Sequence, residues 1–284
     1  MSIDPSVAAL VLVAAVLHAT WNAMVKAEED RLSALAAVLL TGGFVSLCCL
    51  PFVSVPKAAA WPWLITSVVV HVVYVAGLVG AYRHGDLSRV YPLARGSGPL
   101  LVALLAGHVV GEHLTLLQSA GLALACGGIL GLALERGAFS IGRRATLYAL
   151  LTGVSIAAYT IADGLGGRAS GDPLGYTVWL FALEAPWISL YAILRHPNAA
   201  HAYARRQWKR GIGGGLVALT SYGIAIWAMS VAPMALVATL RESSVLFAAL
   251  VGTLLLRESF GGRRIAAAAL IVVGQVLMNL PLGG

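Results

Sequence analysis

Ionisable side chains stand inside long apolar stretches of this sequence, where keeping them is expensive. A charged group at the centre of a bilayer costs about 2.5–3.5 kcal/mol even on lenient insertion scales, so each such residue needs a partner or a task. The residues of this kind are Arg95, Asp163, Glu184, Arg241 and Glu242. They are the first candidates for chemistry.

The two arginines suggest recognition of an anion. A guanidinium group presents a planar fork of donors that binds a carboxylate or a phosphonate through two parallel hydrogen bonds. Arg95 and Arg241 each lie several residues inside an apolar stretch, roughly 9–12 Å from its start at about 1.5 Å per helical residue. Two alternatives stay open: each arginine extends its long side chain to a nearby interface, or it is permanently paired with a carboxylate.

The buried acids suggest recognition of a cation. Residues four apart share one face of a helix, and two such faces combine an acid with aromatic groups: Ser155, Tyr159 and Asp163, then Glu184, Trp187 and Tyr191. Carboxylates and aromatic rings together suit an ammonium group, through charge pairing and cation–π contact. Interfacial belts of Trp and Tyr are the alternative for Trp187 and Tyr191, and solvent exposure is the alternative for Asp163. An acid in a site of low dielectric could also bind a coupled proton.

Further polar groups recur at helical spacing in other apolar stretches. His18, Trp21 and Asn22 share one face, as do His71 and Tyr74. The candidate substrate-binding residues are therefore His18, Trp21, Asn22, His71, Tyr74, Tyr91, Arg95, Tyr159, Asp163, Glu184, Arg241 and Glu242. No HExxH, CxxC or phosphate-loop motif occurs, so we expect no catalytic residue, no metal site and no cofactor.

The elements that must hold these residues are membrane-spanning helices. The chain has 284 residues, 59% of them apolar and only 11% charged, whereas a soluble domain has about 25% charged residues. Apolar runs of 18 or more residues exceed any ordinary strand and match the length of a spanning helix. The predicted spans are 7–25, 32–53, 63–83, 89–110, 114–134, 145–167, 174–194, 211–231, 233–256 and 263–281. The sequence therefore predicts an all-α membrane protein of about ten transmembrane helices.

An internal repeat divides the chain. Arg95 and Glu112 are separated by the same spacing as Arg241 and Glu258, and a constant offset of 146 also places Gly128 on Gly274. We therefore predict a first five-helix repeat over 1–138 and a second over 139–284. Because five is odd, the second repeat must be inverted relative to the first, and inverted repeats are a recurring architecture of secondary transporters.

Basic residues indicate the orientation. The odd-numbered loops hold fifteen Lys and Arg residues and the even-numbered loops only Lys57 and Arg168, which places the odd loops in the cytoplasm and both termini outside. The fifteen are Lys26, Arg31, Arg83, Arg89, Arg136, Arg143, Arg144, Arg195, Arg205, Arg206, Lys209, Arg210, Arg257, Arg263 and Arg264. Because the net charge of +7 gathers in these loops, it is a topology signal, and we expect no nucleic-acid partner.

Three segments carry a resemblance to a known family: HATWNAMVK at 18–26, GDLSRVYPLARGSGPLLVALLAGHVVGEHL at 85–114 and RESSVLFAALVGTLLLRESFGGRR at 241–264. They are similar to the ten-span proteins of the drug/metabolite transporter superfamily that are built from two EamA-type domains. Glu112 and Glu258 match the short turn that ends the fourth span of each such domain. The HATWN segment is also similar to members encoded beside phosphonate-utilisation genes. One departure is Val245, which stands where a proline is found in the family and where Pro99 stands in the first repeat.

The resemblance implies transport of small metabolites through a central cavity. We expect a secondary transporter in the plasma (inner) membrane that moves an amino acid, an amine or an aminophosphonate-like zwitterion by alternating access. Termini outside would differ from the many family members whose termini are cytoplasmic. The expected partners are the bilayer and a small-molecule substrate, and a coupled proton and a homodimer stay open. The alternative is a membrane-embedded enzyme or sensor that acts on a lipid-linked substrate.

Overall fold

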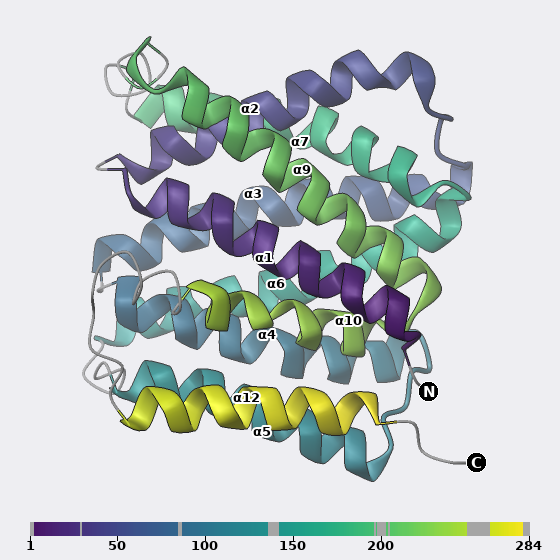
Figure 1. Cartoon of the computed structure of the whole chain (residues 1–284). Coiled ribbons are helices and arrows are strands. Elements are labelled where there is room, and N and C mark those ends of the chain that lie inside the picture. The colour runs from purple at the N-terminus through teal and green to yellow at the C-terminus, as the bar shows by residue number, and fades with distance from the viewer. Residues whose placement is uncertain are drawn as a thin grey trace. The chain divides into compact units, whose positions relative to one another are not determined.

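The computed structural model describes residues 3–28, 30–84, 87–135, 142–195, 197, 203, 205–248 and 262–280. Within these ranges the chain forms ten α-helices and two short 3-10 turns, with no β-strand. The helices are α1 (Pro5–Lys26), α2 (Arg31–Cys49), α3 (Trp61–His84), α4 (Leu87–Val109), α5 (Leu116–Glu135), α6 (Arg143–Ser170), α7 (Pro173–Arg195), α9 (Trp208–Val231), α10 (Met234–Arg241) and α12 (Gly262–Asn279) (Figure 1). The prediction of an all-α membrane protein with about ten helices is confirmed.

Five of the described helical segments are long and apolar enough to cross a bilayer. They are Pro5–Lys26, Arg31–Phe52, Ala58–Leu78, Arg143–Ser170 and Trp208–Val231. Two further apolar segments are shorter, Leu116–Gly131 and Ile265–Asn279. α4 and α7 are as long as these helices but carry Arg95 and Glu184.

The ninth predicted span, 233–256, is interrupted. α10 ends at Arg241, Glu242 forms a turn, and helix resumes over 243–248, after which the span lies outside the described residues. The backbone N–H of Val245 donates to the carbonyl of Glu242 at 3.0 Å, three residues back. This tighter hydrogen bond, of the 3-10 type, marks a local departure from the α-helix at the charged residues.

The GDP segment between α6 and α7 shows how the sequence ends one span and begins the next. Gly171 has φ +79°, a left-handed conformation that glycine adopts without strain and that commonly follows the end of a helix. Asp172 then accepts a hydrogen bond from the N–H of Gly175 at 2.9 Å and caps α7, whose first residue is Pro173. This turn lies between the predicted spans 145–167 and 174–194.

The chain separates into two compact units that do not follow the two sequence repeats. The first unit comprises Met1–Leu12, Val73–Ile161 and Ala232–Gly284, and the second comprises Val13–Val72 and Ala162–Val231. Each unit therefore takes residues from both halves of the sequence. The repeat boundary at 138/139 stays a prediction.

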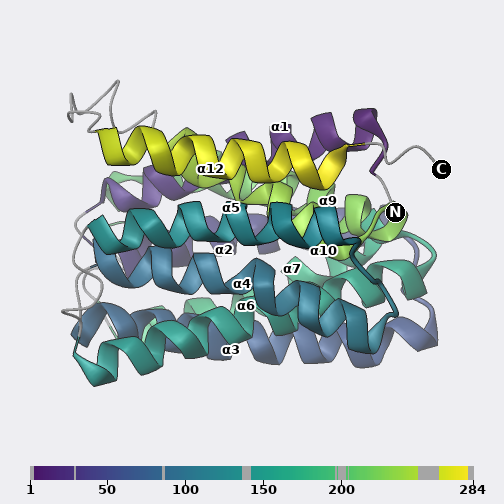
Figure 2. The same ribbon diagram turned by 90° about the horizontal axis from the view of Figure 1, so that it is seen from below.

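Within the first unit, α5 and α12 pack side by side (Figures 1 and 2). A Cβ added at Gly128 would meet the carbonyl oxygen of Ala267 at 2.7 Å and the amide nitrogen of Ile271 at 3.1 Å. A Cβ added at Gly274 would meet the carbonyl oxygen of Gly121 and the amide nitrogen of Ala125. At the offset of 146, Gly128 corresponds to Gly274, Gly121 to Ala267 and Ala125 to Ile271. The two sets of contacts are therefore equivalent at the offset of the predicted repeat.

Within the second unit, α2, α7 and α9 pack against one another through glycines. A Cβ at Gly43 of α2 would clash with the side chain of Ala185 on α7, and one at Gly215 of α9 would meet the carbonyl oxygen of Val38 on α2 at 2.6 Å. Close approach at these glycines brings α7 and α9, which carry Glu184 and Tyr222, against the same helix.

Candidate functional site

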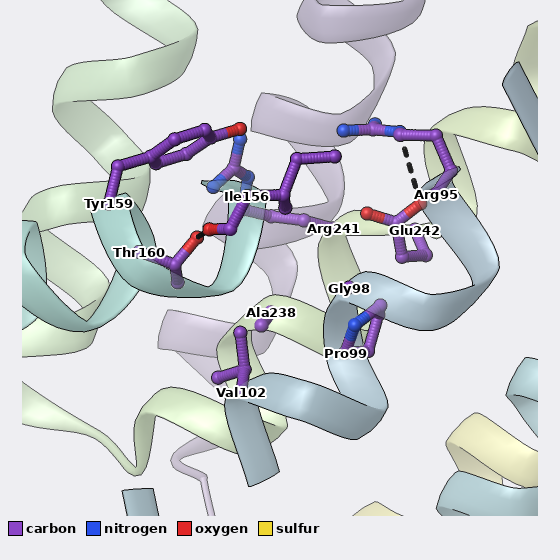
Figure 3. A pocket seen from close by; sticks show the side chains of 10 residues that line it. All are labelled: Arg95, Gly98, Pro99, Val102, Ile156, Tyr159, Thr160, Ala238, Arg241 and Glu242. Atoms are coloured by element: carbon purple, nitrogen blue, oxygen red, sulfur yellow. Dashed lines mark hydrogen bonds and ion pairs between the residues drawn. The ribbon is translucent and has the colours of Figure 1, made fainter. Parts of the chain in front are cut away.

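A small cavity in the first unit lies among several of the predicted residues. It is lined by α4, the first-unit part of α6, and the end of α10 with the turn that follows it. The lining residues are Arg95, Gly98, Pro99, Val102, Ile156, Tyr159, Thr160, Ala238, Arg241 and Glu242 (Figure 3). Its volume is about 10 Å³, enough for one water molecule.

Arg95 and Glu242 form an ion pair in the wall of this cavity. The Nε of Arg95 lies 3.3 Å from Oε2 of Glu242, and its Nη2 donates to the hydroxyl of Ser244 at 3.1 Å. Both charged residues are buried, with about one-twentieth of their surface exposed. Arg95 is thus paired with a carboxylate in this structure.

Arg241 adds a second guanidinium to the same wall. It is 8% exposed, so it is enclosed by protein and does not extend to an interface. Glu242 interacts electrostatically with both arginines. The ionisable residues among the lining are therefore two arginines, one glutamate and the neutral Tyr159, and the cavity wall carries one net positive charge.

α4 and the end of α10 share a feature, although the proline of α4 has no counterpart after α10. In α4, Pro99 has no N–H to donate to the carbonyl of the residue four positions earlier, which is Arg95. At the position 146 residues later, the N–H of Val245 donates to Glu242, three residues back. The α-helical hydrogen-bond pattern thus changes one turn after Arg95 and one turn after Arg241, by a different route.

Two buried polar contacts position α10 and its charged end. Oε2 of Glu112, in the turn after α4, accepts a hydrogen bond from the N–H of Met234 at 2.7 Å, at the first residue of α10. Near the break, the hydroxyl of Ser243 donates to Gln275 of α12 at 2.9 Å, and the amide of Gln275 donates to the carbonyl of Thr239 at 3.2 Å. Both ends of α10 are therefore held by side chains of neighbouring segments.

Aromatic rings complete the wall contributed by α6. Tyr159 is 6% exposed, and its ring meets the ring of Tyr74 edge to face, with centroids 5.7 Å apart. The hydroxyl of Thr160 donates to the carbonyl of Ile156 at 2.6 Å within α6. The structure thus gathers Tyr74, Tyr159, Arg95, Arg241 and Glu242 in the first unit.

A second cluster lies in the second unit and is acidic. Asp163 of α6 is fully buried, which excludes the solvent-exposed alternative. Its Oδ1 accepts a hydrogen bond from the hydroxyl of Tyr176 at 3.2 Å, and its Oδ2 accepts one from the hydroxyl of Tyr222. The carboxylate is thus held by donors from α7 and α9.

Glu184 and His71 stand beside this carboxylate. Oε2 of Glu184, which is 3% exposed, lies 3.5 Å from Nδ1 of His71 and accepts no hydrogen bond within the described part of the chain. His71 Nδ1 lies 3.0 Å from the carbonyl oxygen of Ser67, and the His71 ring meets that of Tyr222 edge to face. Glu184 also interacts electrostatically with Asp163.

The remaining predicted residues lie elsewhere. On α1, the rings of His18 and Trp21 meet edge to face at 5.2 Å, and the amide of Asn22 donates to the carbonyl of His18 at 2.8 Å. Tyr91 belongs to α4, but its side chain lies outside the described residues. Trp187 is 59% exposed. In the described ranges, no three His, Cys, Asp or Glu side chains are grouped to hold a metal ion.

Sequence reasoning missed three groups that contact the charged residues: Tyr176, Tyr222 and Ser244. One of them had a usable signal. α6 and α7 are joined by the short GDP turn, so residues within a few helical turns of it can come together, as Asp163 and Tyr176 do. Gly166 leaves room for the Tyr176 ring. Tyr222 and Ser244 had no such signal, because each comes from a helix distant in sequence.

Comparisons with known proteins agree with this architecture. Residues 143–280 match the model of the EamA-like transporter family. A WAT1-related chloroplastic protein of Arabidopsis thaliana is 24% identical over 197 residues, which cover 66% of this chain and 47% of that protein. An uncharacterised protein of Pseudomonas aeruginosa is 31% identical over 202 residues, or 66% of each chain. The chain thus spans about half the length of the first relative and about two thirds of the second.

One solved structure shows the same fold over nearly the whole chain. This protein, known from a crystal structure, superposes with a TM-score of 0.77 and covers 97% of this chain and 98% of its own. The sequence identity is 21%, so the likeness concerns the fold.

Proposed function

We propose that this chain, which belongs to the EamA-like transporter family of the drug/metabolite transporter superfamily, carries a small zwitterionic metabolite across the membrane by alternating access. Members of the family are multi-pass membrane transporters of small molecules. The proposed substrate class comprises amino acids and aminophosphonate-like compounds, and the proposed location is the plasma membrane.

The observation that carries the proposal is the charge of the cavity wall in the first unit. Arg95 and Arg241 are both buried beside a single carboxylate, Glu242. Two guanidinium groups on the wall of one cavity favour an anionic ligand group there, because their positive potentials add. A carboxylate or phosphonate also matches the planar donor fork of arginine. We therefore assign the anionic group of the substrate to Arg95 and Arg241.

The acidic cluster in the second unit suits a positively charged group. Asp163 and Glu184 are two buried acids, and the rings of Tyr222 and Phe181 lie 6.0 Å apart, centroid to centroid, beside them. Carboxylates and aromatic faces together favour an ammonium group. The chain thus holds a cluster rich in arginine and a separate acidic cluster, and a zwitterion carries groups of both charges, which is why we prefer it to a simple anion or cation.

Alternating access is supported by the small size of the cavity. A volume of about 10 Å³ holds a water molecule and no metabolite, whereas sites for drug-sized ligands measure about 300–1,000 Å³. Substrate must therefore enter after α4, α6 or α10 has moved away from its neighbours. The interrupted helix at Glu242 is a place where such a movement needs few hydrogen bonds to change, and discontinuous helices are frequent at transporter binding sites.

Ligand binding by purified protein tests the assignment. Thermal-shift screening with amino acids, amines and aminophosphonates should identify a zwitterionic probe, and radiolabelled uptake into proteoliposomes should then show its transport. Arg95→Gln and Arg241→Gln should each abolish the shift and the uptake. Arg95→Lys keeps the positive charge but lacks the planar guanidinium group, so it should retain part of the binding.

Arg210→Gln is the matched control for these arginine variants. Arg210 also pairs with a glutamate, Glu28, at 2.6 Å, but its side chain is 55% exposed. Binding and uptake should survive in this variant. A response to hydrophobic compounds alone, or unchanged uptake in both cavity variants, would overturn the proposal.

The membrane orientation is a separate part of the proposal. We place the odd-numbered loops in the cytoplasm, because they hold most of the basic residues. Labelling of single cysteines in intact cells tests it: a cysteine at Ser54, in an even-numbered loop, should react with an impermeant maleimide, and one at Ala27 should not. The reverse pattern would invert the topology.

A further inference from the structure

We propose that Glu184 and His71 form a proton-binding site, in which one exchangeable proton is carried by Glu184 and reaches it through His71. The inference rests on the proposed transport function, because it identifies the ion that such a carrier would move together with its substrate. It concerns the second unit alone and uses contacts within that unit.

Glu184 and its neighbour Asp163 differ in the hydrogen bonds that their carboxyl oxygens accept. Asp163 receives one tyrosine hydroxyl on each carboxylate oxygen, from Tyr176 and Tyr222. Such donors stabilise the ionised form of a carboxylate. Oε2 of Glu184 is equally buried but accepts no hydrogen bond from the described residues. A buried carboxylate oxygen without a donor is costly when charged, and a bound proton removes that cost.

The other helices packed around Glu184 bring little positive charge to it. α3 brings His71, α6 brings Asp163, and α9 brings Tyr222. α2 packs its glycines against this part of α7, and its only charged residue is Arg31 at its first position. α7 itself adds Tyr176. Apart from Arg31, which lies twelve residues before Gly43 on α2, only His71 among these groups can become a cation, so two ionised acids would leave at least one negative charge without a cation beside it.

Protons added one at a time reduce the negative charge of this cluster. With Asp163 ionised, one proton on either Glu184 or His71 leaves a net charge of −1, and a second proton on the other group makes the cluster neutral. The two groups are 3.5 Å apart, which allows them to share or exchange a proton after a small movement. The cluster can therefore take up and release one proton without the formation or cleavage of any other bond.

His71 is the more exposed member of the pair. Its side chain is 12% exposed, compared with 3% for Glu184. The Nδ1 of His71 lies 3.0 Å from the carbonyl oxygen of Ser67, which can only accept, so Nδ1 carries a hydrogen. The opposite ring nitrogen, Nε2, is then the atom that can accept a further proton. This arrangement gives the buried carboxyl group a route for exchange.

Infrared spectroscopy of the purified protein in lipid nanodiscs tests the site without any substrate. A protonated carboxyl group shows a C=O stretching band that an ionised carboxylate lacks. Near neutral pH the wild-type protein should show this band and lose it as the pH is raised, and Glu184→Gln should lack the band near neutral pH. Glu242→Gln is the matched control: Glu242 is equally buried but is paired with Arg95, so its removal should leave the band in place.

The route through His71 is tested by exchange into heavy water. Deuteration shifts the carboxyl band, and the shift should be slower in His71→Gln than in the wild-type protein. Equal rates would overturn the relay. A wild-type protein without the band, or a band unaltered in Glu184→Gln, would overturn the proton site. Size-exclusion chromatography establishes that each variant is folded, and Asp163→Asn, which should retain the band, gives a second comparison.

Failure of this inference is distinguishable from failure of the proposed transport function. The infrared result depends only on the protonation of Glu184, whereas thermal shift with a zwitterionic probe depends on Arg95 and Arg241. A carrier without a proton site would bind the probe and lack the band. A protein with the band but no response to any polar probe would retain the proton site and lose the proposed substrate.

Discussion

Gly128 and Gly274 make equivalent contacts with each other's helices. Each lies where a side chain would strike the backbone of the opposite helix, at a carbonyl oxygen and at an amide nitrogen four residues further along. The two positions are 146 residues apart, the offset at which Arg95 aligns with Arg241. Residues later in α5 contact residues earlier in α12, so the two helices run in opposite directions. An inverted repeat predicts this arrangement.

This relationship predicts equal sensitivity at the two glycines. Gly128→Ala and Gly274→Ala should each destabilise the protein by about 1–3 kcal/mol, because the added methyl group has backbone in its way and the helices must separate. Thermal unfolding in detergent measures the loss. Gly127→Ala is the control: a Cβ there meets no described atom within 4 Å, so stability should be unchanged or slightly higher. Unequal losses at Gly128 and Gly274 would argue against the equivalence.

Glu112 should matter for stability through the start of α10. Glu112→Ala leaves the buried N–H of Met234 without its carboxylate acceptor, at a cost of about 1–3 kcal/mol. Glu112→Gln keeps an acceptor oxygen and should lose less. Because α10 ends at Arg241, the alanine variant should also weaken binding of a zwitterionic probe. A thermal unfolding midpoint equal to that of the wild-type protein would show that this hydrogen bond is dispensable.

The two tyrosines that donate to Asp163 should be coupled to it. Tyr176→Phe and Tyr222→Phe each remove one donor from a fully buried carboxylate, so each should cost about 1–3 kcal/mol of stability. Combined with Asp163→Asn, either change should cost less than it does alone, because the charge that needed the hydroxyl is gone. A double-mutant cycle in chemical or thermal unfolding measures this difference. Additive losses would mean that the hydroxyls act on something else.

Outside the spans, the start of α1 predicts a pH dependence of known sign. The hydroxyl and the backbone N–H of Ser6 both donate to Asp4 and hold the pKa of its carboxyl below the ordinary value of 3.8. Because the folded-state pKa is depressed, this local stabilisation is present above pH 3.8 and is lost as the pH falls through the lowered pKa. Ser6→Ala should bring the pKa of Asp4 back towards 3.8, measured by carbon NMR titration of the carboxyl. An unaltered pKa would contradict the assigned hydrogen bonds.

The positions of the helices follow from local properties of the sequence. Apolar length, turn residues and capping groups act within a few residues, so the GDP turn and the spans around it are readable from the chain alone. The ninth span shows the limit: its apolar run continues through Glu242, but α10 ends at Arg241. The break involves hydrogen bonds from Gln275, a residue of α12, which no local pattern reveals.

The sequence by itself determined that this is a helical membrane protein and that a few ionisable residues lie within its spans, because hydropathy and helical period are properties of consecutive residues. The tertiary structure alone decided the partners of those residues. Arg95 meets Glu242 and Ser244, and Asp163 meets Tyr222, across large separations in sequence. Such pairs depend on which helices pack together and at what height, and that is set by contacts such as those at Gly128 and Gly274.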